Sequence, residues 1–220
     1  MHLMVSFHPP VPKRHTWHLS AYWCSCETLT HSHAVQGISV CLFSRGNYPL
    51  FAALMLRYTG LPLEDCVGKG TGLDDPGLIR KRKIIQKALD QHDKIDEPHE
   101  VLATFGGFEI VMMVGAMLES AVLGRILLID GFIAGSAFLA ASRIVPEIQQ
   151  YAVFTHQSDE QGHSEMLKFL QAEPLLSLGM CLGEGTGAAV AFPLLQSAVA
   201  FLNQMASFES AGVSDRTDGE

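Results

Sequence analysis

The sequence predicts an α/β fold in which a parallel sheet is flanked by helices. Residues 125–130 read Arg-Ile-Leu-Leu-Ile-Asp, a continuous apolar run typical of strands buried on both faces. A Gly-Phe pair follows at once and leads into a helical pattern over residues 133–142. Residues 152–155 are a second short strand candidate, followed by a polar loop and another helical pattern. Strands that alternate with helices in this way are typical of the α/β class.

Length, charge and cysteine content limit the functional classes. The 220 residues suit one ordinary domain, and 48% apolar residues supply a sizeable core. The net charge of -8 argues against a nucleic-acid partner, which would need a basic face. The five scattered cysteines are typical of reduced thiols, and no secretory signal is visible, so we expect a cytoplasmic protein.

Two apolar stretches raise a membrane-spanning alternative. Residues 110–124 and 126–141 contain Glu119 and Asp130 respectively, and each stretch is short of a full span. An acid at mid-bilayer is costly. The sequence therefore favours buried core helices and no membrane partner.

Residues 1–46 differ in character from the rest and are left unassigned. Early prolines break any regular element, no period is sustained, and we expect this leader to be poorly ordered. Its metal-ligating side chains raise a zinc alternative: His15, His18, Cys24, Cys26, His31 and His33. Their spacing matches no closed structural zinc site, so no metal is expected.

Regular patterning begins near residue 48. Residues 49–58 predict a short apolar helix that Gly60 stops. Asp74 and Asp75 are N-cap candidates, and Pro76 suits the first position of a helix that runs to about residue 92. Further helices are predicted from 96–98 to 106–107, over 108–123, over 163–170, and from the glycine-rich stretch 182–187 to about 208.

Two glycine-rich loops and two acids are the candidate functional features. Loops 68–72 and 183–187 could present backbone N–H groups to an anion, with Lys81 in reach of a phosphate at the first loop. Neither loop is a Walker A or a dinucleotide fingerprint. Glu184 among its glycines is either a carboxylate that faces a ligand or a solvated cap. Asp130 ends a predicted parallel strand, where open α/β sheets bind ligands.

A set of motifs in fixed order carries a resemblance to a known family. They stand at residues 68–75 (Gly-Lys-Gly-Thr-Gly-Leu-Asp-Asp), 106–110 (Gly-Gly-Phe-Glu-Ile), 128–133 (Leu-Ile-Asp-Gly-Phe-Ile), 156–162 (His-Gln-Ser-Asp-Glu-Gln-Gly), 173–176 (Glu-Pro-Leu-Leu), 182–189 and 202–213. Together they resemble nicotinate-nucleotide:dimethylbenzimidazole phosphoribosyltransferase over residues 47–214. Residues 215–220 are a polar tail.

The resemblance implies a fold and a reaction. The fold is a Rossmann-like large domain plus the C-terminal helix of a small helical domain, with the N-terminal part of the family fold missing. The reaction moves the 5-phosphoribosyl group of nicotinate mononucleotide to 5,6-dimethylbenzimidazole, and it yields nicotinate and α-ribazole 5′-phosphate for the lower loop of cobalamin. It implies one base, no cofactor or metal, and a homodimer.

The resemblance also assigns site residues. Glu184 aligns with the general base, and Leu182 and Gly183 lie beside it. Four residues match positions at or next to the substrate phosphate: Lys81, Gly70, Ser158 and Gly162. Asp130 matches an acid of the family whose role stays open between direct contact with the ribose and an indirect role through the residues that contact it. We expect His156 and His163 to be structural or surface residues.

The sequence departs from the family pattern in its first part and beside the predicted base. Residues 1–46 lack the family's N-terminal motifs, Leu42 stands where the family has a glutamate, and Cys181 stands where arginine is common. An alternative function is therefore a truncated, non-catalytic remnant that binds a nucleotide or is inactive.

Overall fold

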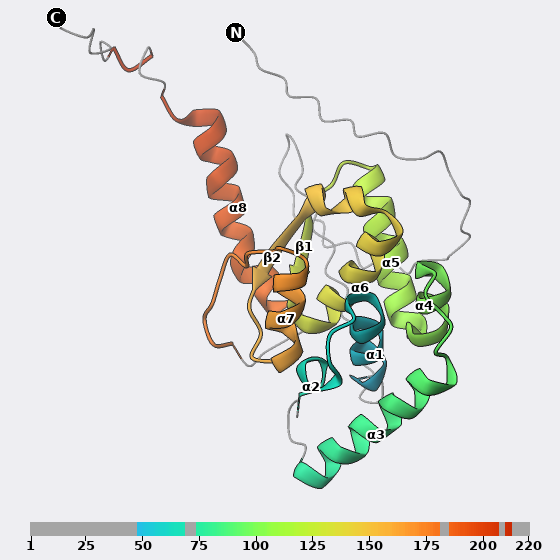
Figure 1. Cartoon of the computed structure of the whole chain (residues 1–220). Coiled ribbons are helices and arrows are strands. Elements are labelled where there is room, and N and C mark those ends of the chain that lie inside the picture. Colours follow the sequence, from blue (N-terminus) through green and yellow to red (C-terminus); the bar gives the residue numbers. More distant parts are fainter. Residues whose placement is uncertain (1–47, 69–73, 181–184, 207–209, 213–220) are drawn as a thin grey trace, which may run out of the picture.

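Helices surround a small parallel sheet in the computed structural model, which describes residues 48–68, 74–180, 185–206 and 210–212 (Figure 1). Strands β1 (Leu127–Asp130) and β2 (Ala152–His156) pair in parallel. The helical elements are α1 (Tyr48–Thr59), α2 (Leu63–Cys66), α3 (Asp75–Gln91), α4 (Pro98–Phe105), α5 (Gly107–Val122), α6 (Gly131–Ile144), the 3-10 helix η1 (Pro146–Tyr151), α7 (Gln161–Phe169) and α8 (Thr186–Gln204). The expected leader 1–46 and tail 215–220 lie outside the described residues.

The two strands end at the same edge of the sheet. The chain runs from β1 through α6 and η1 into β2, and the register pairs Leu127 with Ala152 and Asp130 with His156. The buried Thr155 hydroxyl donates to the Ile129 carbonyl at 3.0 Å and ties the strands together. Asp130 therefore lies at the carboxyl end of a parallel strand, as the sequence predicted.

Helix α6 forms the centre of the core. It contacts α1, α4, α5 and α7 as well as both strands. Its middle consists of small and apolar residues with no exposed surface, Ala137 to Ala141. The Phe138 ring meets the Phe154 ring edge to face, with centroids 5.3 Å apart. Small side chains let neighbouring helices approach closely, and Phe138 fills the space next to β2.

Local capping signals in the sequence define two helix starts. The Asp74 carboxylate accepts from the Gly77 N–H at 2.8 Å at the start of α3, as the cap prediction required. At the start of α4 the Glu97 carboxylate accepts from the N–H groups of His99 and Glu100. Both helices carry proline in their first turn, where no N–H is needed.

Three details differ from the sequence predictions. Helix α8 ends at Gln204 and not near residue 208. The 3-10 helix η1 begins at Pro146, in a stretch for which the sequence predicted no element. The predicted buried helix over 108–123 is half-buried, with Phe108 94% exposed. In an amphipathic helix the apolar side chains show which face is buried. This stretch is apolar on all sides, so its sequence does not show which face packs against the core.

Helix α8 packs through its first turns and then extends away from the body (Figure 1). It contacts β1 and β2. Apolar side chains farther along are exposed: Val190, Leu194, Val199, Phe201, Leu202 and Met205. Among the described helices α8 alone is long and apolar enough to cross a membrane by length and composition, and a single helix of this kind is weak evidence for a membrane.

Replacement of Phe138 tests the assignment of the core. Phe138→Ala should lower the free energy of unfolding by about 3–5 kcal/mol, because it leaves a cavity beside Phe154. The control Phe108→Ala, at a side chain that is 94% exposed, should change it by less than about 0.5 kcal/mol. Urea denaturation followed by circular dichroism measures both values. Equal effects of the two variants would contradict the core described above.

Candidate functional site

A buried acid–imidazole pair lies where the two strands end. Asp130 Oδ1 and His156 Nδ1 are 2.7 Å apart, and the side chains are 9% and 3% exposed. The two atoms face each other within ion-pair distance, but the contact lacks the geometry of a hydrogen bond. Neither Asp130 oxygen has a hydrogen bond of good geometry within the described part of the chain. The carboxylate thus retains acceptor capacity in a buried place.

The first turn of α8 lies directly against this pair. A Cβ atom built at Gly187 would overlap His156 Nδ1 and Asp130 Oδ1, so only glycine fits there. Gly185 precedes the helix with φ of 82°, a left-handed conformation that favours glycine. Gly185 and Gly187 are therefore required for different physical reasons, the backbone conformation at Gly185 and the lack of space at Gly187. Residues 182–184, including the predicted base Glu184, lie outside the described residues.

His163 connects the strand ends to the loop that follows β2. Its Nδ1 accepts from the Ser158 N–H at 2.9 Å, so the neutral ring carries its proton on Nε2. Burial, and then the nearby His156, lower the pKa of His163 from 6.5 to about 4. The two imidazole centroids are 6.5 Å apart. A neutral, buried His163 holds the Ser158 backbone beside the Asp130–His156 pair.

Lys81 reaches the start of the first glycine-rich loop from α3. Its Nζ donates to the Gly68 carbonyl at 3.2 Å. Burial lowers the pKa of the Lys81 ammonium, and the Glu160 carboxylate partly offsets that shift. Lys81 therefore lies between Gly68 and the loop that contains Ser158 and Glu160.

Gly162 holds these two loops together through close packing. A Cβ atom there would be 2.9 Å from the Cys66 carbonyl oxygen and 3.0 Å from the Phe132 ring. Gly162 lies in the first turn of α7, whose amino end thereby packs on the end of α2. The chain just before Gly68 is thus fixed next to the Ser158 loop.

The structure brings together four of the predicted site residues and leaves four undescribed. Lys81, Ser158 and Gly162 lie around the 66–68 and 157–162 segments, and Asp130 joins them through His156 and His163. The Ser158 hydroxyl accepts from the Glu160 N–H at 3.3 Å, which is a local turn before α7. Gly70, Leu182, Gly183 and Glu184 lie outside the described residues, and the roles of all eight residues stay predictions.

Sequence reasoning missed three residues of this arrangement. His156 and His163 are 2% and 1% exposed, which excludes the surface alternative for both. The available signal for His156 was its position at the end of an apolar strand that parallels β1. Gly187 gave no signal beyond membership of a glycine-rich loop, since its role depends on where α8 is seated.

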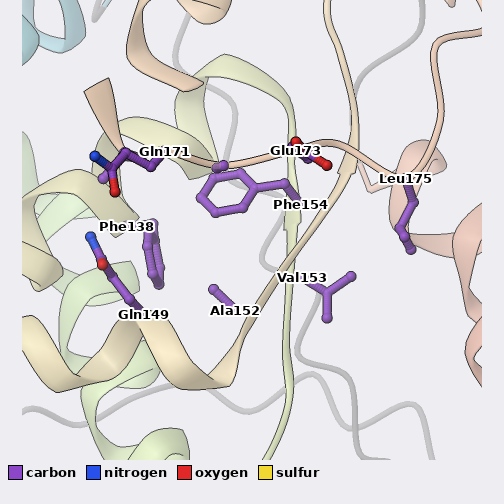
Figure 2. A pocket seen from close by; sticks show the side chains of 10 residues that line it. Phe138, Gln149, Ala152, Val153, Phe154, Gln171, Glu173 and Leu175 are labelled. Atoms are coloured by element: carbon purple, nitrogen blue, oxygen red, sulfur yellow. The ribbon is translucent and has the colours of Figure 1, made fainter. Parts of the chain in front are cut away.

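A separate cavity of about 400 Å³ opens beside β2 (Figure 2). Phe138 and Phe154 line its apolar side, and Gln149, Gln171 and Glu173 supply its polar groups. It shares no lining residue with the strand-end arrangement. Within the described segments no cluster of three or more metal-ligating side chains could hold a metal ion.

Comparison with known proteins identifies the family. Residues 29–213 match a family model described as phosphoribosyltransferase. The matched region begins within the segment 1–46 that the sequence alone left unassigned. The chain is also 55% identical over 185 residues to the nicotinate-nucleotide–dimethylbenzimidazole phosphoribosyltransferase of Cupriavidus taiwanensis, and the match covers 83% of this chain and 54% of that protein. The chain belongs to this phosphoribosyltransferase family.

Other family members show the same partial coverage. The corresponding protein of Dechloromonas aromatica is 54% identical over 189 residues, and the match covers 83% of this chain and 54% of that protein. The crystal structure of CobT from Thermus thermophilus matches with a TM-score of 0.72 and 42% identity, over 77% of this chain and 50% of the other. This chain spans about half the length of the relatives it matches.

The low pKa of His163 predicts a pH-dependent stability. In the unfolded chain the His163 ring binds a proton below about pH 6.5, whereas in the folded chain it binds one only near pH 4. Between these two values the unfolded state binds more protons than the folded state, so the free energy of unfolding falls as the pH falls. The full effect is on the order of 3 kcal/mol. His163→Gln should flatten the slope of unfolding free energy against pH in this window, whereas His92→Gln, at an exposed histidine, should leave it unchanged. Urea denaturation at a series of pH values measures the slopes, and an unaltered slope in His163→Gln would contradict this account.

Proposed function

We propose that this chain transfers the 5-phosphoribosyl group of nicotinate mononucleotide to 5,6-dimethylbenzimidazole. Family membership supports the reaction class, and the relatives' names supply the substrates. The single observation that carries the proposal is the joining of Lys81, the Ser158 loop, and the Asp130 strand end into one contact network at the start of α8. A phosphorylated sugar requires such a combination of a cation, backbone donors and a carboxylate.

The phosphate is proposed to bind between Lys81 and the Ser158 loop. Lys81 already donates to a backbone carbonyl at 3.2 Å, so its ammonium is oriented along the start of the first glycine-rich loop. A phosphate dianion favours the charged amine and opposes the effect of burial on its pKa. The glycine-rich loop 68–72 would add backbone N–H donors.

The chemistry requires one proton acceptor. The bond between C1′ and the cationic pyridinium nitrogen breaks, and nicotinate leaves with a neutral ring nitrogen. A benzimidazole nitrogen forms the new bond to C1′, and Glu184 takes the proton from the other ring nitrogen. A carboxylate near the ribose stabilises an oxocarbenium-like transition state, which is the role we propose for the charge of Asp130. The proposal involves no metal or redox cofactor.

The wider architecture of the family belongs to the same proposal. We place the two-stranded sheet in a Rossmann-like large domain and assign α8 to a small helical domain of a cytoplasmic homodimer. The exposed apolar side chains of α8 are compatible with such a contact. The alternative function is the non-catalytic remnant named from the sequence, which would bind a nucleotide without turning it over.

Replacement of the predicted base tests the proposed reaction. Purified chain is incubated with nicotinate mononucleotide and dimethylbenzimidazole, and α-ribazole 5′-phosphate is measured by liquid chromatography. Glu184→Gln should lower kcat by about 100-fold or more, since a positioned general base contributes about 10² to 10⁴. Glu173→Gln, at an exposed glutamate, is the control and should retain full activity.

The outcomes separate the enzyme from the remnant. Product from the unmodified chain and from Glu173→Gln, but not from Glu184→Gln, supports the reaction and the base. A folded, unmodified chain that forms no product contradicts the catalytic function. Calorimetric binding of nicotinate mononucleotide by such an inactive chain would then support the remnant.

A further inference from the structure

Two neighbouring side chains of α3 bond to two neighbouring backbone carbonyls where the chain leaves α2. The Arg82 guanidinium donates to the Val67 carbonyl at 3.3 Å, and the Lys81 ammonium donates to the Gly68 carbonyl at 3.2 Å. Successive side chains leave a helix about 100° apart, so the two cations reach this segment from different directions. Hydrogen bonds from charged donors are the stronger class. The start of the first glycine-rich loop is therefore fixed to α3 at two successive residues.

The Arg82 bond also sets the direction of a backbone N–H group. The Val67 carbonyl and the Gly68 N–H belong to one planar peptide unit, and no described peptide bond is cis, so the two groups point in opposite directions. Val67 is fully buried, and the Gly68 N–H makes no hydrogen bond within the part of the chain that the structure describes. A backbone N–H without an internal acceptor is available to an anion. Arg82 thus holds the peptide that carries this donor.

The same peptide lies next to the segment that contains Ser158. Helices α2 and α7 are in contact there. The carbonyl of Cys66, the residue before Val67, would be 2.9 Å from a Cβ atom at Gly162, so these two segments are packed without spare room. A displacement of Val67 therefore moves Gly68 relative to the Ser158 loop.

A second arginine ties the end of α3 to α1. Arg57 donates to the backbone carbonyls of His92 and Asp93, at 2.9 Å each, and to that of Ile95. Like Arg82 it is half-buried, and its Nε has no hydrogen-bond partner among the described residues. Its first carbonyl partner lies ten residues beyond Arg82, about 15 Å along a helix. The two arginines make the same kind of contact at different places along α3, and of the two Arg82 is bonded to the start of the glycine-rich loop.

We infer that Arg82 is a positioning residue of the phosphate site: by holding the Val67–Gly68 peptide, it directs the Gly68 N–H toward the phosphate that Lys81 binds. That this phosphate belongs to nicotinate mononucleotide rests on the proposed function. Arg82 acts through the backbone and makes no contact with the substrate. Loss of Arg82 therefore weakens phosphate binding, whereas loss of Arg57 destabilises α3 without this defect.

Binding of nicotinate mononucleotide, measured by isothermal titration calorimetry, tests the inference. Arg82→Met removes the donors and keeps an apolar stem. It should raise the dissociation constant about tenfold or more, as expected for one lost hydrogen bond to a charged group. Arg82→Lys supplies one charged donor for the single bond to the Val67 carbonyl, and should return the constant to within about threefold of the unmodified chain. Arg57→Met is the matched control: it should also stay within about threefold, although urea denaturation should show a loss of stability at least as large as that of Arg82→Met.

Amide hydrogen exchange in the ligand-free chain tests the contact itself. The Val67 N–H donates to the Leu63 carbonyl at 3.1 Å, so its exchange rate reports whether the end of α2 stays in place. Arg82→Met should raise this rate about tenfold or more relative to the amides of α6, whereas Arg57→Met should change both by the same factor. If Arg82→Met does not fold, Arg82→Gln takes its place with the same expected results, because it keeps a polar group but is too short to reach the Val67 carbonyl.

Activity separates this inference from the proposed function. In an active chain, Arg82→Met should raise KM for nicotinate mononucleotide about tenfold or more and change kcat less than about threefold, because it removes binding and not the proton acceptor. An unmodified chain that binds nicotinate mononucleotide but forms no product contradicts the proposed function and leaves the inference standing. Equal weakening of binding in Arg82→Met and Arg57→Met, no binding by the unmodified chain, or unchanged Val67 exchange in Arg82→Met would overturn the positioning role.

Discussion

The contact between the Asp130–His156 pair and Gly187 is the constraint on which the rest of this site depends. It joins three elements that are distant in sequence, β1, β2 and α8, at one buried point. The parallel register brings the acid and the imidazole together, and the absence of a side chain at Gly187 lets the helix approach them. The same contact places the amino end of a helix over the carboxyl ends of strands, which is a common location for ligands in α/β folds.

The remaining site residues are held by a chain of contacts that starts from this point. His163 lies beside His156 and holds the Ser158 backbone, and Gly162 packs the same segment against Cys66. Lys81 then extends from α3 to the carbonyl at Gly68. Each contact is buried or half-buried, so a change at one end alters the position of the next. These contacts link α3, α7 and the strand ends around the proposed substrate site.

Local signals allowed much of the fold to be predicted from the sequence. The apolar run that ends at Asp130, the Asp74 cap and the Gly-Phe turn into α6 each act over a few residues, and all of them are present in the structure. Resemblance to the family indicated Lys81 and Ser158, and the structure adds their partners. The burial of His156 and His163 was not predictable, because it depends on strand pairing and on the seating of α8. The exposed face of α5 could not be predicted, because the sequence of this helix is apolar on all sides.

The most direct test of this account is a titration of the chain with nicotinate mononucleotide, followed by two-dimensional ¹H–¹⁵N NMR of the backbone amides. The account predicts that amides of Gly68, of residues 158–162 and of residues 185–188 shift together with a single dissociation constant, because they belong to one site. The amides of Gln171 and Ala172 at the separate cavity should stay unchanged. Shifts confined to that cavity, or independent titration of the 158–162 and 185–188 amides, would contradict the account.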